Sequence, residues 1–269
     1  LGIKFEHNAA NAPVALNGSL KIEETRAVPG ISAKLNTIAK IRGEYVIASK
    51  YDFWFLNADL SPKFHAAMDP WFSANVLDLV GITALDKDAY VLMGSNKSLL
   101  RVRQNPEADD VQGWPNFTAG RSHIEAVGGL GRARIDTERA KFSYIHSSAT
   151  DGRYVFMATV PDNKNKKQFV ISKALMKDWM LSGEFVPTAE MLKKDRSLGE
   201  LYVTGMVYED GKLYAVSKNW NVLVVIDVAQ EAVVEAWGLP EELTDIRGLV
   251  KDGSTFEVID ANRVVKLTM

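Results

Sequence analysis

Short turns between apolar runs of this chain repeatedly bring together aromatic, amide and charged side chains. Aromatic rings stack on a sugar or a peptide group, and polar side chains hydrogen-bond to it, so the combination is typical of a binding site. Turns are polar in any case and tryptophan packs well between sheets, so a structural role is the alternative. The candidates that we single out are Tyr51, Asp52, Asn96, Asn219, Trp220, Arg247 and Asn262. Further members of the set are Lys97, Asp162, Asn163, Trp71 and Trp114.

Residue types needed for several kinds of catalysis are missing or scattered. The chain has no cysteine, which excludes zinc–thiolate sites, iron–sulfur clusters, disulfides and thiol nucleophiles. No Gly-x-Ser-x-Gly motif is present, and no two histidines have metal-ligand spacing. The histidines are His7, His65, His123 and His146. With no catalytic motif assembled, we expect a non-catalytic binding module.

The overall charge narrows the choice of partner. A net charge of −2 gives no global field that would hold a nucleic acid, so we expect a protein or a small-molecule ligand instead. No apolar run approaches the roughly 18 residues of a membrane helix, so we expect no membrane insertion in this segment. The chain begins at Leu1 without Met, as it would after removal of a signal peptide. We therefore expect a periplasmic or otherwise extracytoplasmic protein, with a cytoplasmic one as the alternative.

Five strand-like runs, each preceded by a tight-turn signal, organise the whole chain. Four of the turns contain Asp, and the first has Gly43 alone; both residue types tolerate the left-handed backbone of a hairpin. A second apolar strand follows each run after a short polar turn. The runs are RGEYVIASK (42–50), DKDAYVLMGSNK (86–97), DGRYVFMATV (151–160), DGKLYAVSKN (210–219) and DGSTFEVIDAN (252–262).

The spacing of these runs predicts an all-β propeller of four-stranded antiparallel blades, in one domain over residues 1–269. The intervals from Tyr45 to Tyr90 and from Tyr214 to Phe256 match the propeller-blade period of about 40–50 residues. Proline, which is unsuited to central strands, recurs in the links between units. These prolines are Pro29, Pro70, Pro115, Pro187 and Pro240. We favour five blades, and a degenerate sixth blade within residues 125–145 is the alternative.

The last unit ends two strands after its turn and lacks an outer strand. The segment SLKIEETRAVPG (19–30) has the composition to supply it, so we expect an N-terminal strand to close the ring. Turns between second and third strands then lie on the same face as the crossings between blades. Because loops from every blade meet there, we expect the binding site on that face. Residues 188–200 are expected to form a short surface helix capped at Thr188.

The layout resembles propellers of the NHL and YVTN type. The matching features are the repeated Asp-Gly turns ahead of Tyr-containing strands and the terminal DIRGLVKDGSTFEVIDANRVVKL (245–267). The resemblance covers most of the chain. It implies the propeller fold, which hosts binding scaffolds, lactonases, lyases and sensors alike.

A narrower comparison is with gluconolactonase-like propellers, which hold a divalent metal in the central channel. This similarity implies the alternative function of a divalent-metal-dependent lactonase or hydrolase, with calcium or another divalent cation bound by Asn96, Asn219 and Asp260. The early Glu-Gly-Pro of those proteins is absent, since Glu23-Glu24 is followed by Thr25. Asn is also an ordinary hairpin residue, so we favour a protein without a cofactor.

Overall fold

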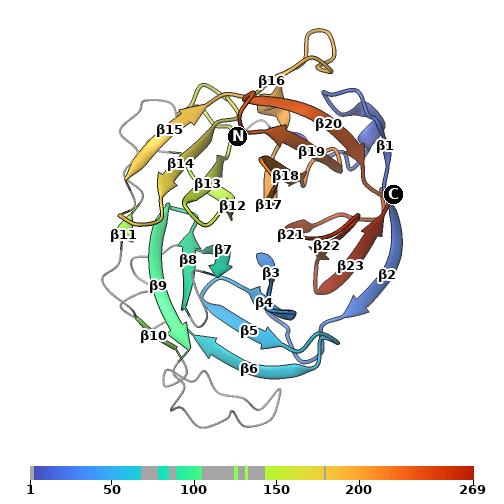
Figure 1. Ribbon diagram of the computed structural model, residues 1–269. Coiled ribbons are helices and arrows are strands. Elements are labelled where there is room, and N and C mark those ends of the chain that lie inside the picture. The colour runs from blue at the N-terminus through green and yellow to red at the C-terminus, as the bar shows by residue number, and fades with distance from the viewer. Residues whose placement is uncertain are drawn as a thin grey trace.

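The computed structural model describes residues 3–67, 78–84, 89–104, 124–126, 131–132, 143–178 and 180–269. In this part of the chain, five antiparallel sheets stand around a common centre as the blades of a propeller (Figure 1). The chain passes through each blade from the innermost strand outward, so β3, β7, β12, β17 and β21 surround the centre (Figure 1).

In blades 1 to 3 the strands follow one another in sequence. Blade 1 contains β3 (Thr37–Ile41), β4 (Glu44–Ala48), β5 (Asp52–Leu56) and β6 (Pro62–Ala67). Blade 2 contains β7 (Leu79–Ala84), β8 (Ala89–Gly94) and β9 (Ser98–Gln104), with β10 (Ile124–Ala126) and β11 (Gly131–Arg132) both paired to β9. Blade 3 contains β12 (Ile145–Thr150), β13 (Tyr154–Thr159), β14 (Ile171–Leu175) and β15 (Leu181–Phe185).

The two C-terminal blades share the N-terminal segment of the chain. Blade 4 contains β17 (Val203–Glu209), β18 (Lys212–Ser217), β19 (Val222–Asp227) and β20 (Ala232–Gly238). The short β1 (Gly18–Ser19) and β16 (Thr188–Ala189) pair with β20 in parallel. Blade 5 contains β21 (Ile246–Asp252), β22 (Thr255–Asp260), β23 (Arg263–Thr268) and β2 (Lys21–Ala27). Two 3-10 turns, η1 (Ala9–Asn11) and η3 (Leu198–Glu200), complete the described elements.

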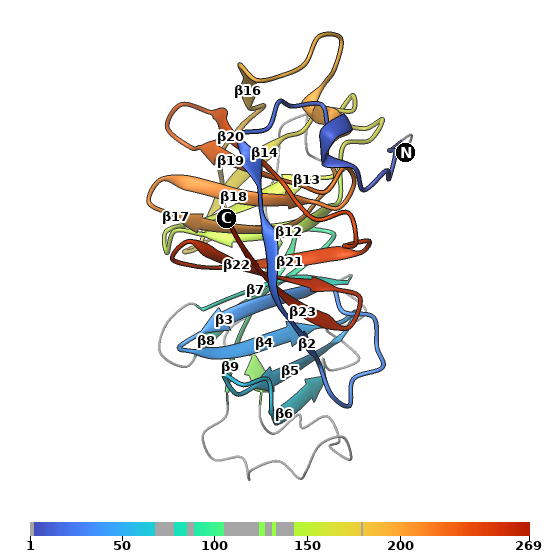
Figure 2. The same cartoon turned by 90° about the vertical axis from the view of Figure 1, so that its right-hand side faces the viewer.

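The predicted five-blade ring and its closure are confirmed. The five marked runs contain the second strand of each blade, and β2 pairs antiparallel with β23 from Lys21 opposite Thr268 to Ala27 opposite Arg263. Figure 2 shows this segment running along the outer side of the ring. The six-blade alternative is wrong, because the described residues of 125–145 belong to β10, β11 and the start of β12, in blades 2 and 3.

The helix predicted over residues 188–200 is wrong. Thr188 and Ala189 form β16, and Leu192 makes an isolated antiparallel bridge with Val14. The N–H of Lys193 donates to the carbonyl of Pro13, 2.8 Å away. The backbone of residues 188–193 thus pairs with other segments of the chain, including the N-terminal one, instead of forming hydrogen bonds within a helix. Of residues 188–200, only η3, which has a capping box at Ser197, has helical form.

The core lies between the blades rather than within one layer. Second and third strands are covered by neighbouring blades on both faces, so they lack the alternation of a half-exposed strand. In β19, five consecutive residues from Val222 to Ile226 are buried. One cluster joins Val216 and Leu223 of blade 4 to Phe256 and Val258 of blade 5. Within the described residues, no helix is long and apolar enough to cross a membrane.

Inner strands approach one another closely because five blades form a narrow ring. A Cβ atom on Gly205 of β17 would lie 2.4 Å from the carbonyl carbon of Gly248 in β21. Gly248 itself has a φ of +70°, which side-chain-bearing residues rarely adopt. These two glycines therefore set how tightly blades 4 and 5 pack at the centre.

Candidate functional site

Residues that begin the inner strands gather at one end of the central channel. A cavity of about 280 Å³ opens there, lined by residues of blades 2, 3 and 4 and the crossings before them. We call this cavity the mouth. Its lining residues are Asp78, Ser95, Tyr144, His146, Val160, Asp162 and Tyr202.

Backbone bulges position some of these side chains. The pairing of β12 with β13 shifts between Ile145 and Ser147, which leaves His146 as the extra residue. Corresponding shifts in β7 and β17 leave Val80 and Thr204 extra. A bulge re-aims the side chain of its extra residue, so the same irregularity in three blades shapes this end of the channel. The ring of His146 lies 5.3 Å from that of Tyr202, between centroids.

Three cations from three parts of the ring lie beside the mouth. Arg247 is the second residue of β21, Lys218 follows β18, and Lys34 precedes β3. Asp245 accepts from both Lys218, at 2.6 Å, and Arg247, at 3.1 Å. One carboxylate thus faces three cations, and we call Lys34, Lys218 and Arg247 the cation cluster.

The protonation equilibria of His146 and Lys34 reflect the nearby positive charges. Burial, together with Arg247, lowers the pKa of His146 to about 4 against the opposing effect of Asp78. Arg247, burial and Lys218 lower the pKa of Lys34, although Asp245 opposes them. His146 is therefore neutral at physiological pH, and Arg247 and Lys218 destabilise the charged form of Lys34. An anion bound among them would relieve that repulsion.

Polar residues of the turns between second and third strands hold the crossings in place. Asn219 is fully buried; its Oδ1 accepts from the N–H of Tyr202 at 2.7 Å, and its Nδ2 donates to the carbonyl of Glu200. In blade 5, Asp260 Oδ1 accepts from the N–H groups of Thr244, at 3.1 Å, and Asp245, at 2.8 Å. These turns support the backbone that carries the mouth.

The seven predicted binding residues occupy different environments, and their ligand contacts stay a prediction. Arg247 adjoins the mouth, with 12% of its side chain exposed. Asn262 donates to the carbonyl of Ile31 at 3.0 Å. Trp220 is 4% exposed beneath the guanidinium of Arg196, which lies 5.0 Å from its ring.

The remaining candidates lie in the turns of blades 1 and 2. Asp52 pairs with His65 at 2.9 Å, and the ammonium of Lys50 lies 5.3 Å from the ring of Tyr51. Asn96 Oδ1 accepts from the N–H of Ser98 at 3.3 Å.

Three residues of the wider set also fall within the described chain. Asp162 lines the mouth, and its neighbour Asn163 accepts the N–H of Lys166 through its carbonyl, at 3.4 Å. Lys97 is buried, which lowers its pKa to about 8 against the opposing effect of Asp162. Trp71, Trp114 and His123 lie outside the described residues.

Sequence reasoning missed most of the mouth. The candidates included Arg247 but not His146, Tyr202, Lys218 or Asp245. Each of these four residues stands within two positions of an inner strand's first residue or directly after a second strand. A rule based on these positions would therefore have identified them. Among the described residues, no group of three or more His, Cys, Asp or Glu side chains is placed to hold a metal ion.

Comparisons with known proteins place the chain by its fold. No protein-family model and no curated protein matches the sequence. The structure is similar to a glutaminyl cyclase from Myxococcus xanthus, with a TM-score of 0.64 and 11% identity over 95% of this chain and 97% of the other. It is also similar to a PQQ-bound aldose sugar dehydrogenase from Streptomyces coelicolor, with a TM-score of 0.52 and 11% identity over 95% and 99%. At this identity the likeness shows a β-propeller fold and no more, and the NHL and YVTN resemblance stays a prediction.

Proposed function

We propose that this propeller is a non-catalytic, extracytoplasmic binding module that recognises a small carboxylate-bearing molecule at the mouth. The observation that supports the proposal is the cation cluster, in which Lys34, Lys218 and Arg247 lie around the carboxylate of Asp245. Lys34, whose pKa is lowered by the neighbouring Arg247, has the perturbed protonation that is typical of functional sites, and several cations beside a cavity favour an anionic ligand.

The proposed ligand is an organic acid with an apolar or aromatic part. Arg247 offers a planar set of donors that matches a carboxylate, and Lys218 adds a point charge. Tyr202 provides a ring surface, on which Phe5 of this chain already packs edge-on at 5.8 Å between centroids. A volume of about 280 Å³ favours a small acid over a folded partner.

Benzoate tests the proposal, with benzamide as its uncharged analogue. By isothermal titration calorimetry at low ionic strength, benzoate should bind and benzamide should bind at least tenfold more weakly. Lys218→Gln should weaken benzoate binding at least tenfold. Lys212→Gln, at the opposite end of the same strand, is the matched control and should leave it unchanged.

Two outcomes contradict this function. Equal binding of benzoate and benzamide would show that charge plays no part at the mouth. Binding of an acidic peptide with no binding of benzoate would instead favour a protein partner on the same face, which is the other ligand class expected from the sequence.

A further inference from the structure

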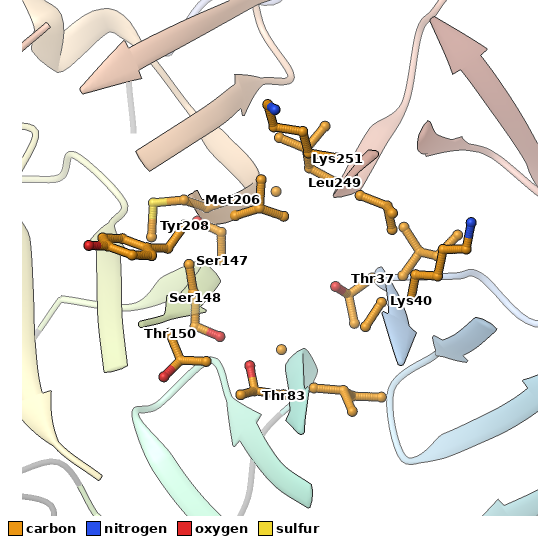
Figure 3. Close-up of a pocket in the computed structure, with 18 of the residues that line it drawn as sticks. Thr37, Lys40, Thr83, Ser147, Ser148, Thr150, Met206, Tyr208, Leu249 and Lys251 are labelled. Atoms are coloured by element: carbon orange, nitrogen blue, oxygen red, sulfur yellow. The ribbon is translucent and has the colours of Figure 1, made fainter. Parts of the chain in front are cut away.

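The other end of the central channel contains a second cavity, larger than the mouth and different in chemistry. Its volume is about 520 Å³, within the range of small-molecule sites, and all five inner strands contribute to it. We call it the lower channel. Figure 3 shows side chains of several blades facing this space.

Hydroxyl groups from three blades face the lower channel. Thr37, Thr83 and Ser148, from blades 1, 2 and 3, direct their oxygens toward the space between the strands (Figure 3). Gly81 makes room for one of them, because a Cβ atom there would lie 2.0 Å from Ser148 Oγ. Thr150 differs, since its hydroxyl donates to the carbonyl of Tyr154 at 2.7 Å.

A buried polar atom borders the same cavity without a partner. Ser147 is 1% exposed and lines the lower channel, and its Oγ has no hydrogen-bond partner among the described residues. Leaving a buried hydroxyl unpaired costs about 1–3 kcal/mol. Because this oxygen is shielded from solvent, it does not itself contact a ligand in the cavity. Each inner strand also pairs with only one neighbouring strand in the described chain, which leaves backbone donors and acceptors along its inner edge.

Charges around the lower channel cancel in pairs. Lys40 Nζ lies 3.3 Å from Asp252, and Lys251 Nζ lies 2.5 Å from Glu209. These four are the ionisable Asp, Glu, Lys and Arg side chains that line the cavity, so its formal net charge is zero. A charged ligand would gain no counter-charge here, in contrast to the mouth.

We propose that the lower channel binds a neutral polyhydroxyl molecule, such as a monosaccharide. The hydroxyl groups of a polyol both donate and accept, as do those of Thr37, Thr83 and Ser148. The two ends of the channel then select opposite chemistries, an acid at the mouth and an uncharged polyol in the lower channel.

D-Glucose is the probe for this site, measured by saturation-transfer NMR and calorimetry. Binding to the unmodified protein is expected, and Thr83→Val and Ser148→Ala should each raise the dissociation constant at least tenfold. Thr25→Val and Ser254→Ala make the same chemical changes at exposed positions outside the cavity and should leave it unchanged.

Benzoate binding separates this proposal from the proposed function. Thr83→Val should keep the benzoate affinity of the unmodified protein, and Lys218→Gln should keep its D-glucose affinity. Absence of D-glucose binding, or binding that Thr83→Val and Ser148→Ala leave unchanged, overturns the inference and shows that the lower channel holds water only.

Discussion

The phenol of Tyr45 in blade 1 hydrogen-bonds to the carboxylate of Glu257 in blade 5, with its Oη 2.6 Å from Oε2. Arg26 of the ring-closing strand β2 joins them, 3.0 Å from Glu257 and 3.1 Å from the Tyr45 oxygen. Burial, with the hydrogen bond to Glu257, raises the pKa of Tyr45 to about 12. The bond therefore links the first and last blades to the N-terminal strand across the closure of the ring.

Removing this link should destabilise the fold. Tyr45→Phe leaves Glu257, which is 5% exposed, with one partner fewer, so we expect a loss of about 1–3 kcal/mol in the free energy of unfolding. Urea denaturation followed by circular dichroism measures it. Glu44→Gln removes a carboxylate whose side chain is 41% exposed and should cost about 0–1 kcal/mol. Equal losses in the two variants would contradict the conclusion that the buried bond between Tyr45 and Glu257 stabilises the fold more than the exposed carboxylate of Glu44 does.

Acid should weaken the fold through His146. The pKa of this residue is lowered to about 4 in the folded protein, so the unfolded chain binds a proton first as the pH falls below its model value of 6.5. Stability is then lost between about pH 6.5 and 4, by roughly 3 kcal/mol in total. His146→Gln should remove that share of the pH dependence in urea titrations at a series of pH values. An identical slope in His146→Gln would show that other groups cause the acid sensitivity.

A side chain at Gly205 should force the inner strands apart. The Cβ atom of Gly205→Ala would meet backbone of Gly248 at 2.4 Å, and backbone gives way less easily than a side-chain end. We expect a loss of about 1–3 kcal/mol or more in thermal and urea unfolding. Gly183→Ala serves as the control, because its nearest neighbour, Lys173 Cε at 3.6 Å, is at ordinary contact distance. Loss of the same size in both variants would show that crowding against Gly248 is not responsible.

Calcium should leave the melting temperature unchanged. Of the three oxygen ligands that the gluconolactonase resemblance implies, Asn219 Oδ1 and Asp260 Oδ1 already accept backbone N–H groups, and Asp260 Oδ2 lies 2.5 Å from Arg263. Asn96 Oδ1 accepts from Ser98. Binding a cation would break these bonds. A calcium-dependent rise in melting temperature, lost in Asp260→Asn, would favour the metal-dependent hydrolase.

Sequence patterns predicted the ring better than the site because the two depend on different distances along the chain. The hairpins within blades follow from local turns such as Asp210-Gly211, whose backbone has positive φ at both residues. The role of Asn219 depends instead on Glu200 and Tyr202, which precede it by most of a hairpin and come near only when blade 4 folds. Arg247 was among the candidates because it stands close to a crossing between blades, which Pro240 marks in the sequence. The bulge that positions His146 has no such marker.

The closure by β2 also constrains how the protein is made. Lys21–Ala27 leave the ribosome before any blade, yet their partner Arg263–Thr268 is synthesised last. The strand β2 must therefore remain unpaired while the blades are synthesised, because its partner β23 is completed only at the end of the chain. Such long-range pairing is slow, so we expect ring closure to be the last and slowest step of folding, and the step at which a newly made chain is most exposed to aggregation.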